Sequence, residues 1–322
     1  MNYKISIALA TYNGKEYLKN QIDSYFSQTR TPDELIVCDD CSTDGTFALL
    51  QAYKELLPSK IFIYRNEINL GYSANFEKAI GLCTGDLIFL SDQDDIWFKN
   101  KIECIERYFI NNKEVYLLIH DAQLVDERLE WSGLTKLDQV KSGYGNDDNY
   151  FTGALTAFRN TLKDIILPFP EVLSDHDIWI HLVAKMIDRR VVLPDILQYI
   201  RRHNQNTSDG AASSLKKINK VSVLLSQMKT DPANSYEERI SVNKALQKRL
   251  KNIIDIETDA TRKIKIYKNL DYLFKEGDAI NNRALLINFK LYKRLIISIK
   301  NYISGDYKYF NGIYSLVRDV IR

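Results

Sequence analysis

Three carboxylate side chains occur within four residues, at Asp92, Asp94 and Asp95. They cannot all stay ionised side by side without a counter-charge, which a divalent cation with oxygen ligands, Mg²⁺ or Mn²⁺, would supply. The apolar run 87–90 before them is too short for a helix and predicts a buried strand. Because ligands of open α/β sheets lie beyond the carboxyl ends of strands, the acidic stretch indicates a metal and a phosphorylated ligand. The alternative is a solvated acidic turn that caps the next helix.

The first hundred residues alternate between apolar runs, polar loops and helical patterns. Strands are expected at 5–10, 34–38, 61–64 and 87–90, with helices at 15–27, 47–56 and 75–82. This order predicts an α/β fold with a doubly wound, mostly parallel sheet, whose polar loops gather at one edge. Further strands are expected at 115–120, 154–158, 191–193 and 196–200, and a helix is expected from 174 to about 189. The polar segment 120–150 is expected to be irregular and to act as an acceptor loop or lid.

Several familiar signatures are missing from the sequence. No G-x-G-x-x-G follows the first strand, and no G-x-x-x-x-G-K-[ST] occurs, so neither a dinucleotide fold nor a P-loop is supported. Cys38 and Cys41 form a C-x-x-C without a second Cys or His pair nearby, which argues against zinc or redox chemistry. Cys83 and Cys104 complete no regular framework, and this fits a reducing compartment.

Charge divides the chain of 322 residues into two parts. Residues 1–210 hold 22 Lys and Arg against 31 Asp and Glu, whereas residues 211–322 hold 22 against 11. This asymmetry suggests that the two parts of the chain have different functions. The second part reads as helices at about 215–230, 235–255, 258–275 and 280–303, and it contains no Asp, His or Cys cluster that could do chemistry.

One of these helices is both apolar and basic. Apolar residues recur at three- and four-residue intervals among four cations; they are Leu285, Leu286, Phe289, Tyr292, Leu295, Ile296 and Ile299, with Lys290, Lys293, Arg294 and Lys300. Such a helix can lie on an anionic membrane surface, or its apolar stripe can pack against the rest of the chain or a second subunit. Neither a secretory signal nor a stretch of about 18 uncharged apolar residues is visible, so a cytoplasmic protein is expected. Peripheral contact with a membrane and a homo-oligomer are two of the alternatives for this helix. No nucleic-acid partner is expected.

Four stretches of residues 3–210 resemble the family-2 glycosyltransferases of the GT-A fold. The stretches are Thr11-Tyr12-Asn13-Gly14, Asp39-Asp40-x-Ser42-x-Asp44-Gly45-Thr46, Asn69-x-Gly71-x3-Asn75 and Ser91-Asp92-Gln93-Asp94-Asp95-Ile96-Trp97. The last form is most similar to bacterial rhamnosyltransferase-type members. The resemblance implies a GT-A nucleotide-sugar-binding catalytic domain over 1–210, with 211–322 providing acceptor, membrane or oligomer contacts.

The resemblance also implies where a nucleotide sugar would bind. The loop Thr11, Tyr12 and Asn13 is similar to a nucleoside shelf, on which the Tyr12 ring would stack on or cover the base. Asp40 resembles the carboxylate that accepts from the base. The remaining donor contacts that it implies are Asn75, Asp92 near the ribose, Gln93, Arg201 and Arg202, and arginines suit phosphate.

For the metal, the resemblance implies Asp94 as a ligand, with Asp95 orienting the site or bridging through water. His203, which follows two arginines after a predicted strand, resembles the late histidine that closes over the diphosphate or the metal. The alternative for a lone histidine is an ordinary surface or core position. The cofactor expected from these residues is Mn²⁺ or Mg²⁺.

The catalytic base expected of an inverting transferase is one of two aspartates. Ser174-Asp175-His176-Asp177-Ile178-Trp179 resembles the family's helix start that bears an acidic residue. Asp175 and Asp177 are two positions apart, so on a helix they point about 200° apart and cannot both face one site. The S-x-x-D spacing of Ser174 and Asp177 also suits a capping box. We favour Asp177, with Asp175 as the alternative.

Together these features predict an inverting, metal-dependent glycosyltransferase with a nucleotide-diphosphate sugar as donor. The donor expected first is dTDP-rhamnose, with a UDP-hexose or UDP-N-acetylhexosamine as alternatives. The acceptor would be a bacterial surface polysaccharide, such as capsule, O-antigen or wall polymer, or a lipid-linked oligosaccharide. One rival is a nucleotidyltransferase, but the first loop lacks the Gly-rich basic character needed for a triphosphate. Another is a non-catalytic carbohydrate-binding protein, against which the intact acidic triplet argues.

Overall fold

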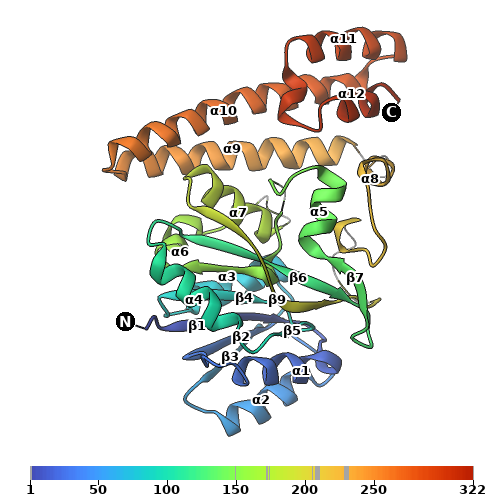
Figure 1. The fold of residues 1–322 in the computed structure, drawn as a ribbon. Helices are drawn as coiled ribbons and strands as arrows, with labels where there is room; N and C mark the ends of the chain where they lie inside the picture. Colours follow the sequence, from blue (N-terminus) through green and yellow to red (C-terminus); the bar gives the residue numbers. More distant parts are fainter. Residues whose placement is uncertain are drawn as a thin grey trace.

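The computed structural model describes residues 2–321 except 149, 172, 174, 205, 207–210 and 228–231. Its first part is the expected parallel α/β unit (Figure 1). The elements are β1 (Ile5–Thr11), α1 (Lys15–Phe26), β2 (Glu34–Asp39), α2 (Thr46–Leu56), β3 (Ile61–Arg65), α3 (Tyr72–Leu82) and β4 (Leu87–Ser91). β1 pairs in parallel with both β2 and β4, and β2 pairs in parallel with β3. The predicted fold class is confirmed.

The second half of the sheet mixes parallel and antiparallel strands. Its strands are β5 (Ile96–Trp97), β6 (Leu117–Val125), β7 (Trp131–Thr135), β8 (Thr156–Arg159) and β9 (Arg190–Arg201). The order across the sheet is β3-β2-β1-β4-β8-β6-β9-β5, with β7 paired to β6. β8 is antiparallel to β4 and β6, whereas β9 runs parallel to β6 and antiparallel to β5.

Two sequence predictions in this half are wrong. The strands expected at 191–193 and 196–200 are one strand, β9, because exposed Pro194 sits where its pairing with β6 shifts register, and a bulge tolerates a proline. The segment 120–150 is largely ordered: β6 continues to Val125, and β7 and α5 (Lys136–Tyr144) follow. Buried His120 and Asp121 interrupt the apolar run of β6, which hid its length.

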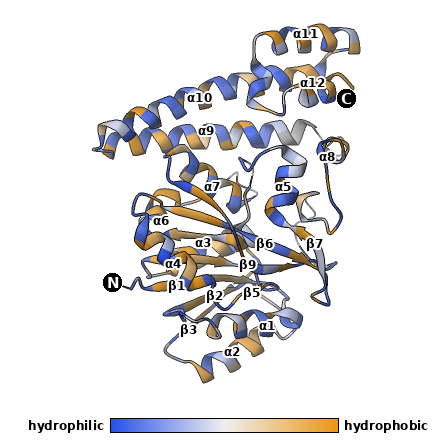
Figure 2. Ribbon diagram, viewed as in Figure 1, coloured by the Kyte–Doolittle hydropathy of each residue, from blue (hydrophilic) through white to orange (hydrophobic). Residues whose placement is uncertain are grey.

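Helices cover the sheet on both faces. The core beneath α1, α2 and α4 (Lys101–Asn111) contains buried apolar residues such as Ile7, Leu35 and Phe89. The opposite core lies under α3, α6 (Asn160–Ile166) and α7 (His176–Met186). In Figure 2 the central strands are predominantly hydrophobic, whereas the covering helices are mixed. This arrangement fixes the strands whose ends carry the polar loops.

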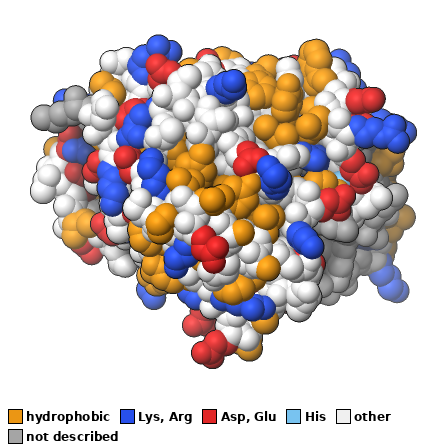
Figure 3. All heavy atoms as spheres, turned by 90° about the horizontal axis from the view of Figure 1, so that it is seen from below, with side chains coloured by type: hydrophobic (Ala, Val, Ile, Leu, Met, Phe, Trp, Pro, Cys, Tyr) orange, Lys and Arg blue, Asp and Glu red, His pale blue; other side chains and the backbone are white. Residues whose placement is uncertain are grey.

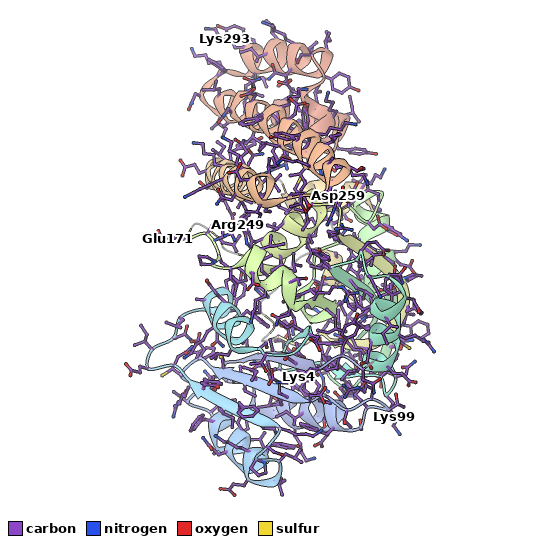
Figure 4. The ribbon with its side chains drawn as sticks, turned by 90° about the vertical axis from the view of Figure 1, so that its left-hand side faces the viewer. Lys4, Lys99, Glu171, Arg249, Asp259 and Lys293 are labelled. Atoms are coloured by element: carbon purple, nitrogen blue, oxygen red, sulfur yellow. The ribbon has the colours of Figure 1, made fainter. Side chains whose placement is uncertain are left out.

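The C-terminal region is helical, as predicted, and it continues the second core. α9 (Pro232–Ile256) and α10 (Ala260–Leu285) form a long antiparallel pair above α7 (Figure 1). Leu250 of α9 and Ile266 of α10 belong to the same buried cluster as Trp179 of α7. Arg249, labelled in Figure 4, donates hydrogen bonds to the backbone carbonyls of Leu167 and Pro168 at 2.8 and 2.7 Å. The helices are therefore docked on the α/β unit.

The helix predicted at 280–303 is wrong as one element. α10 runs on to Leu285, a short 3₁₀ turn occupies Leu286–Asn288, and α11 (Leu291–Ile303) follows; α8 (Lys220–Gln227) and α12 (Ile313–Ile321) complete the region. Near the end of α10, fully buried Arg283 forms a bidentate ion pair with Asp319 of α12, at 2.6 and 2.8 Å, which ties α12 to α10. In the sequence, apolar residues recur at helical spacing from Leu285 to Ile299 without a break, so the pattern did not indicate that turn. Within the described residues we find no helix with the length and apolarity to span a bilayer.

Candidate active site

The polar loops after β1, β2, β3 and β4 meet at the carboxyl edge of the sheet and are cross-linked by side chains. Asn13 accepts from the Thr43 backbone N–H at 2.8 Å, and Thr11 donates to Asp39 at 3.1 Å. Gln93 makes two hydrogen bonds of 2.9 Å with the backbone of Tyr12. Any side chain at Gly14 would overlap the Gln93 amide, which explains the glycine there. The loops thus form one rigid rim.

Two residues expected to contact the donor are buried within this rim. The Asp40 carboxylate accepts from the backbone N–H groups of Leu70 and Gly71 at 2.8 and 2.9 Å and from the side chain of Asn66. Asn75 donates to the Cys38 carbonyl at 2.8 Å and accepts from Asn66. Both side chains are almost fully inaccessible. In this structure they shape the third loop, and a direct contact with a donor stays a prediction.

Tyr12 is the member of the first loop that faces outward. Its side chain is 49% exposed, whereas Thr11 is buried. An aromatic face at the edge of the rim suits stacking against a planar base. The geometry is compatible with the nucleoside shelf that the sequence suggested.

The acidic triplet lies beyond β4 as predicted. Asp92, Asp94 and Asp95 each present a carboxylate oxygen within 4.8 Å of the others. The protein around this carboxylate, followed by the charges of Asp94 and Asp95, raises the pKa of Asp92; because Asp92 is a solvent-exposed residue, the two neighbouring charges are the cause on which we rely. Such crowding favours either protonation or a bound cation. These oxygens are the hard ligands that Mg²⁺ and Mn²⁺ prefer.

Asp94 and His203 are brought together from positions 109 residues apart. The His203 Nε2 atom lies 2.9 Å from Asp94 Oδ2, and Asn206 donates to the same oxygen at 3.0 Å. The pairing of β5 with β9 places the end of β9 beside the acidic loop, and the His203 ring stacks on Tyr17 with centroids 4.3 Å apart. Asn206 was not singled out from the sequence.

Asp95 has a different environment from its neighbours. Its oxygens accept from the Gln198 side chain at 2.8 Å and the Arg201 backbone N–H at 3.2 Å. The ammonium group of fully buried Lys101 donates a hydrogen bond to the side chain of Gln198. Burial, together with the Asp94 charge, raises the pKa of Asp95 to about 8. Asp95 therefore ties the acidic loop to β9, which agrees with the orienting role expected for it.

The two candidate bases lie at the start of α7 with different partners. Asp175 accepts from the Tyr72 hydroxyl at 2.5 Å. Asp177 accepts from the Gly153 N–H at 2.7 Å and lies 2.7 Å from His176 Nε2. A Cβ at position 153 would overlap the Asp177 carboxylate, so a larger residue there would displace that side chain. Ser174, the expected capping-box partner, lies outside the described residues.

His176 and Asp177 perturb one another's protonation. Burial alone would raise the pKa of Asp177, but the adjacent imidazole and the Gly153 N–H outweigh it and lower the pKa to about 2. Conversely, burial would lower the pKa of His176, and the Asp177 charge instead raises it. The pair therefore keeps Asp177 ionised at any working pH. The Asp177 side chain remains 27% exposed, so it is accessible to a ligand.

Lys136 is a site residue that the sequence analysis missed. It begins α5, within the segment expected to be irregular, and its ammonium donates to Ser213 at 2.6 Å. Burial and the nearby Arg202 lower its pKa to about 8, whereas the charges of Asp177, Asp95 and Asp92 act in the opposite sense. Lys136 and Arg202 thus bring positive charge to the acidic site, where a diphosphate would need it.

A mostly parallel sheet with an acid cluster and a late histidine at its carboxyl edge defines the class of GT-A glycosyltransferases. The family model described as "Glycosyl transferase family 2" matches residues 6–163. The chain therefore carries a family-2 glycosyltransferase domain, which spans just under half of its length.

Known proteins agree with this assignment. The putative teichuronic acid biosynthesis glycosyltransferase TuaG of Bacillus subtilis is 26% identical over 190 residues, which is 56% of this chain and 72% of TuaG. The chain covers only 34% and 49% of the lengths of two other curated relatives.

Two solved structures share the fold. S. aureus TarS 1–349, in complex with UDP-GlcNAc, aligns at a TM-score of 0.60 and 16% identity, over 98% of this chain and 90% of that one. The mannosyltransferase PcManGT from Pyrobaculum calidifontis, in complex with GDP-Man and Mn²⁺, aligns at 0.50 and 14% identity, over 100% of this chain and 87% of that one. At these identities the likeness concerns the fold alone.

Proposed function

We propose that this enzyme is an inverting, metal-dependent glycosyltransferase that transfers a sugar from a nucleotide-diphosphate donor to a bacterial polysaccharide or a lipid-linked oligosaccharide. The observation that carries the proposal is the meeting of Asp92, Asp94 and His203 at one edge of the sheet, with Asp177 held on the 3₁₀ turn that packs against β4. Complexes of TarS with UDP-GlcNAc and of PcManGT with GDP-Man support a nucleotide-sugar donor. The name of TuaG supports polysaccharide synthesis. dTDP-rhamnose and UDP-hexoses are the donors to test first.

The side chains that could act as metal ligands fit a divalent cation. Asp92 and Asp94 offer carboxylate oxygens near the His203 imidazole, whereas the oxygens of Asp95 already accept protein hydrogen bonds. Asp92, Asp94 and His203 would hold Mn²⁺ or Mg²⁺, with Asp95 orienting their loop. When bound, such a cation neutralises a diphosphate leaving group as a Lewis acid. Lys136 and Arg202 would bind the phosphate oxygens from the other side.

Asp177 is the base in this proposal. It accepts a hydrogen bond from Gly153, and the 3₁₀ turn Gly153–Leu155 packs against β4, the strand that leads into the acidic triplet. The acceptor oxygen attacks the anomeric carbon as its proton passes to the Asp177 carboxylate and the bond from that carbon to the diphosphate oxygen breaks. The Gly153 N–H and His176 hold the carboxylate in place. Inversion follows from attack opposite the leaving group.

A peripheral membrane contact through α11 forms part of the proposal, because a lipid-linked acceptor resides at a membrane. Its outward side chains include Tyr292, Leu295, Ile296 and Ile299, each at least 44% exposed. No acidic residue lies between Asp278 and Asp306, whereas Lys293 marks the exposed tip (Figure 4).

Charge complementarity favours an anionic lipid surface over a symmetric dimer, since a dimer through this face would oppose like charges. By contrast, Figure 3 shows basic and acidic side chains interspersed over the face beneath α1 and α2.

A panel of nucleotide sugars with and without Mn²⁺ tests the proposal. A true donor must raise the melting temperature because it binds only the native state, and it should release its nucleoside diphosphate slowly in the absence of acceptor. Stabilisation by donor and Mn²⁺ together, with loss of both effects in EDTA, is the expected result. If neither dTDP- nor UDP- nor GDP-sugars stabilise the protein, the proposed function is wrong. Pyrophosphate release from a nucleoside triphosphate would instead identify a nucleotidyltransferase.

A further inference from the structure

A cleft of about 1310 Å³ separates the α/β unit from the C-terminal helices. One side is formed by α7 and the segment between α5 and β8, and the other by α9 and α10. Its far end is bounded by the 3₁₀ turn Asp306–Tyr309 and by α12. The long helix pair lies over α7 and α5 in Figure 1 and rises above the α/β unit in Figure 4. The cleft therefore exists because the C-terminal region docks where it does.

The near end of the cleft reaches the start of α7, where the alternative base Asp175 lies. Asp175, at the start of α7, lines it, and so does Phe151, two residues before the Gly153 that binds Asp177. From there α10 lines the cleft from Lys265 to Ile280, a span of about 22 Å at the rise of an α-helix. This length exceeds a single sugar and suits an extended chain.

Aromatic rings line the middle and the far end. Tyr272 of α10 and Tyr309 lie edge to face with ring centroids 5.1 Å apart, and Tyr272 is 41% exposed. Phe310 continues this aromatic surface. The electron-rich face of an aromatic ring attracts the weakly positive C–H groups of a pyranose, so the surface suits sugar rings better than a compact ion.

Cations outnumber carboxylates along the cleft: seven Lys and Arg line it with five Asp and Glu. Three of those carboxylates have a cationic partner, since Asp148 lies 2.8 Å from Lys185, Glu276 lies 3.9 Å from Arg239, and Asp188 pairs with Lys265; the other two are Asp175 and Glu238. Over the described residues, three lining lysines have no carboxylate within ion-pair distance; they are Lys220, Lys268 and Lys308. A ligand with negative groups would supply their counter-charges.

We propose that this cleft is the acceptor subsite and that it binds an extended oligosaccharide carrying acidic groups. The chain would lie along Tyr272 and Tyr309 with its terminal hydroxyl at the start of α7, which carries both candidate bases. This proposal rests on the proposed function and adds the location and the chemical class of the acceptor. It also assigns the C-terminal helices a role in substrate binding.

The test uses the full chain and two labelled probes, fluorescein-tagged hexagalacturonate and fluorescein-tagged maltohexaose. Tyr272→Ala and Lys268→Glu alter the cleft. Tyr267→Ala is the matched control, because Tyr267 is 52% exposed on the same helix and does not line the cleft; Lys248→Glu on α9 is the control for charge. Fluorescence anisotropy at low salt gives the dissociation constants.

We expect hexagalacturonate to bind and each cleft substitution to weaken it about tenfold, a loss of about 1.4 kcal/mol, with both controls close to wild type. Equal binding of neutral maltohexaose would overturn the acidic class of ligand. Absence of binding of both probes, or equal losses in the controls, would overturn the subsite. Donor stabilisation with Mn²⁺ is measured in the same variants and should not change. Its failure in the wild type would refute the proposed function, whatever the probe result.

Discussion

Replacing Asp177 by Asn removes the proposed base with the smallest change in shape. The amide oxygen can still accept from the Gly153 N–H, which Asp177 now binds at 2.7 Å, so the start of α7 should keep its position. Transfer should fall by about 10²–10⁴-fold, the usual contribution of a positioned general base. At 1.36 kcal/mol for each tenfold, this loss corresponds to about 3–5 kcal/mol of activation free energy.

The same substitution has a calculable effect on stability. The folded protein lowers the Asp177 pKa from 3.8 to about 2, which corresponds to about 2.5 kcal/mol of stabilisation at neutral pH. Because the pKa is lowered, this stabilisation is complete above about pH 4 and is lost as the pH falls towards 2. Asp177→Asn should therefore lower the melting temperature by several degrees at pH 7, and by less at pH 3.

The assay compares Asp177→Asn with Asp175→Asn. Acceptor glycosylation and donor-dependent stabilisation are measured for both variants, and the base variant should lose transfer while it binds donor normally. Asp175→Asn removes a charge but keeps an oxygen that can accept from the Tyr72 hydroxyl, and it should cost less than about tenfold in rate. If Asp177→Asn keeps nearly wild-type transfer and only melts earlier, or if Asp175→Asn shows the larger loss in rate, the assignment of the base is refuted.

Four further predictions address other parts of the chain. Asp94→Asn should abolish both transfer and Mn²⁺-dependent donor stabilisation while the unliganded melting temperature changes little; near-normal turnover would contradict the metal site. The wild-type transfer rate should fall as the pH rises through about 8, where Lys136 loses its proton, and Lys136→Met should be slower and lack that decline in a pH–rate profile. Arg283→Met leaves Asp319 buried without its partner, so urea unfolding should show a loss of about 3–5 kcal/mol; a loss within experimental error would show that the pair is dispensable. In flotation assays the protein should bind vesicles with anionic phosphatidylglycerol at low salt, and Ile296→Glu should reduce binding; flotation with neither vesicle type would exclude the membrane contact.

The first half of the fold could be predicted because its signals are local. Each of β1 to β4 is a short apolar run that ends in a polar loop, and the parallel pairing then places the loops together. The proximity of His203 to Asp94 came from family resemblance rather than from periodicity. Its physical cause is the pairing of β5 with β9, two strands about a hundred residues apart, and no local pattern encodes such a pairing.

The parts that escaped prediction have polar side chains in buried places. His120 and Asp121 are inaccessible members of β6, but in a sequence they resemble a loop. Lys136 reads as a surface residue until the fold buries it beside Arg202 and Ser213. Gly153 has no local reason to be glycine, and only the approach of Asp177 from α7 shows why. In each case the deciding partner is distant in sequence.

The shared core of α7, α9 and α10 has a consequence for how the protein unfolds. Leu250, Ile254 and Ile266 complete the same apolar cluster as Ile88 and Trp179, so a fragment that ends near residue 210 would expose one side of that cluster to water. Calorimetry of the whole chain should therefore give a single cooperative transition instead of two. Recombination at this boundary would therefore transfer only half of a core.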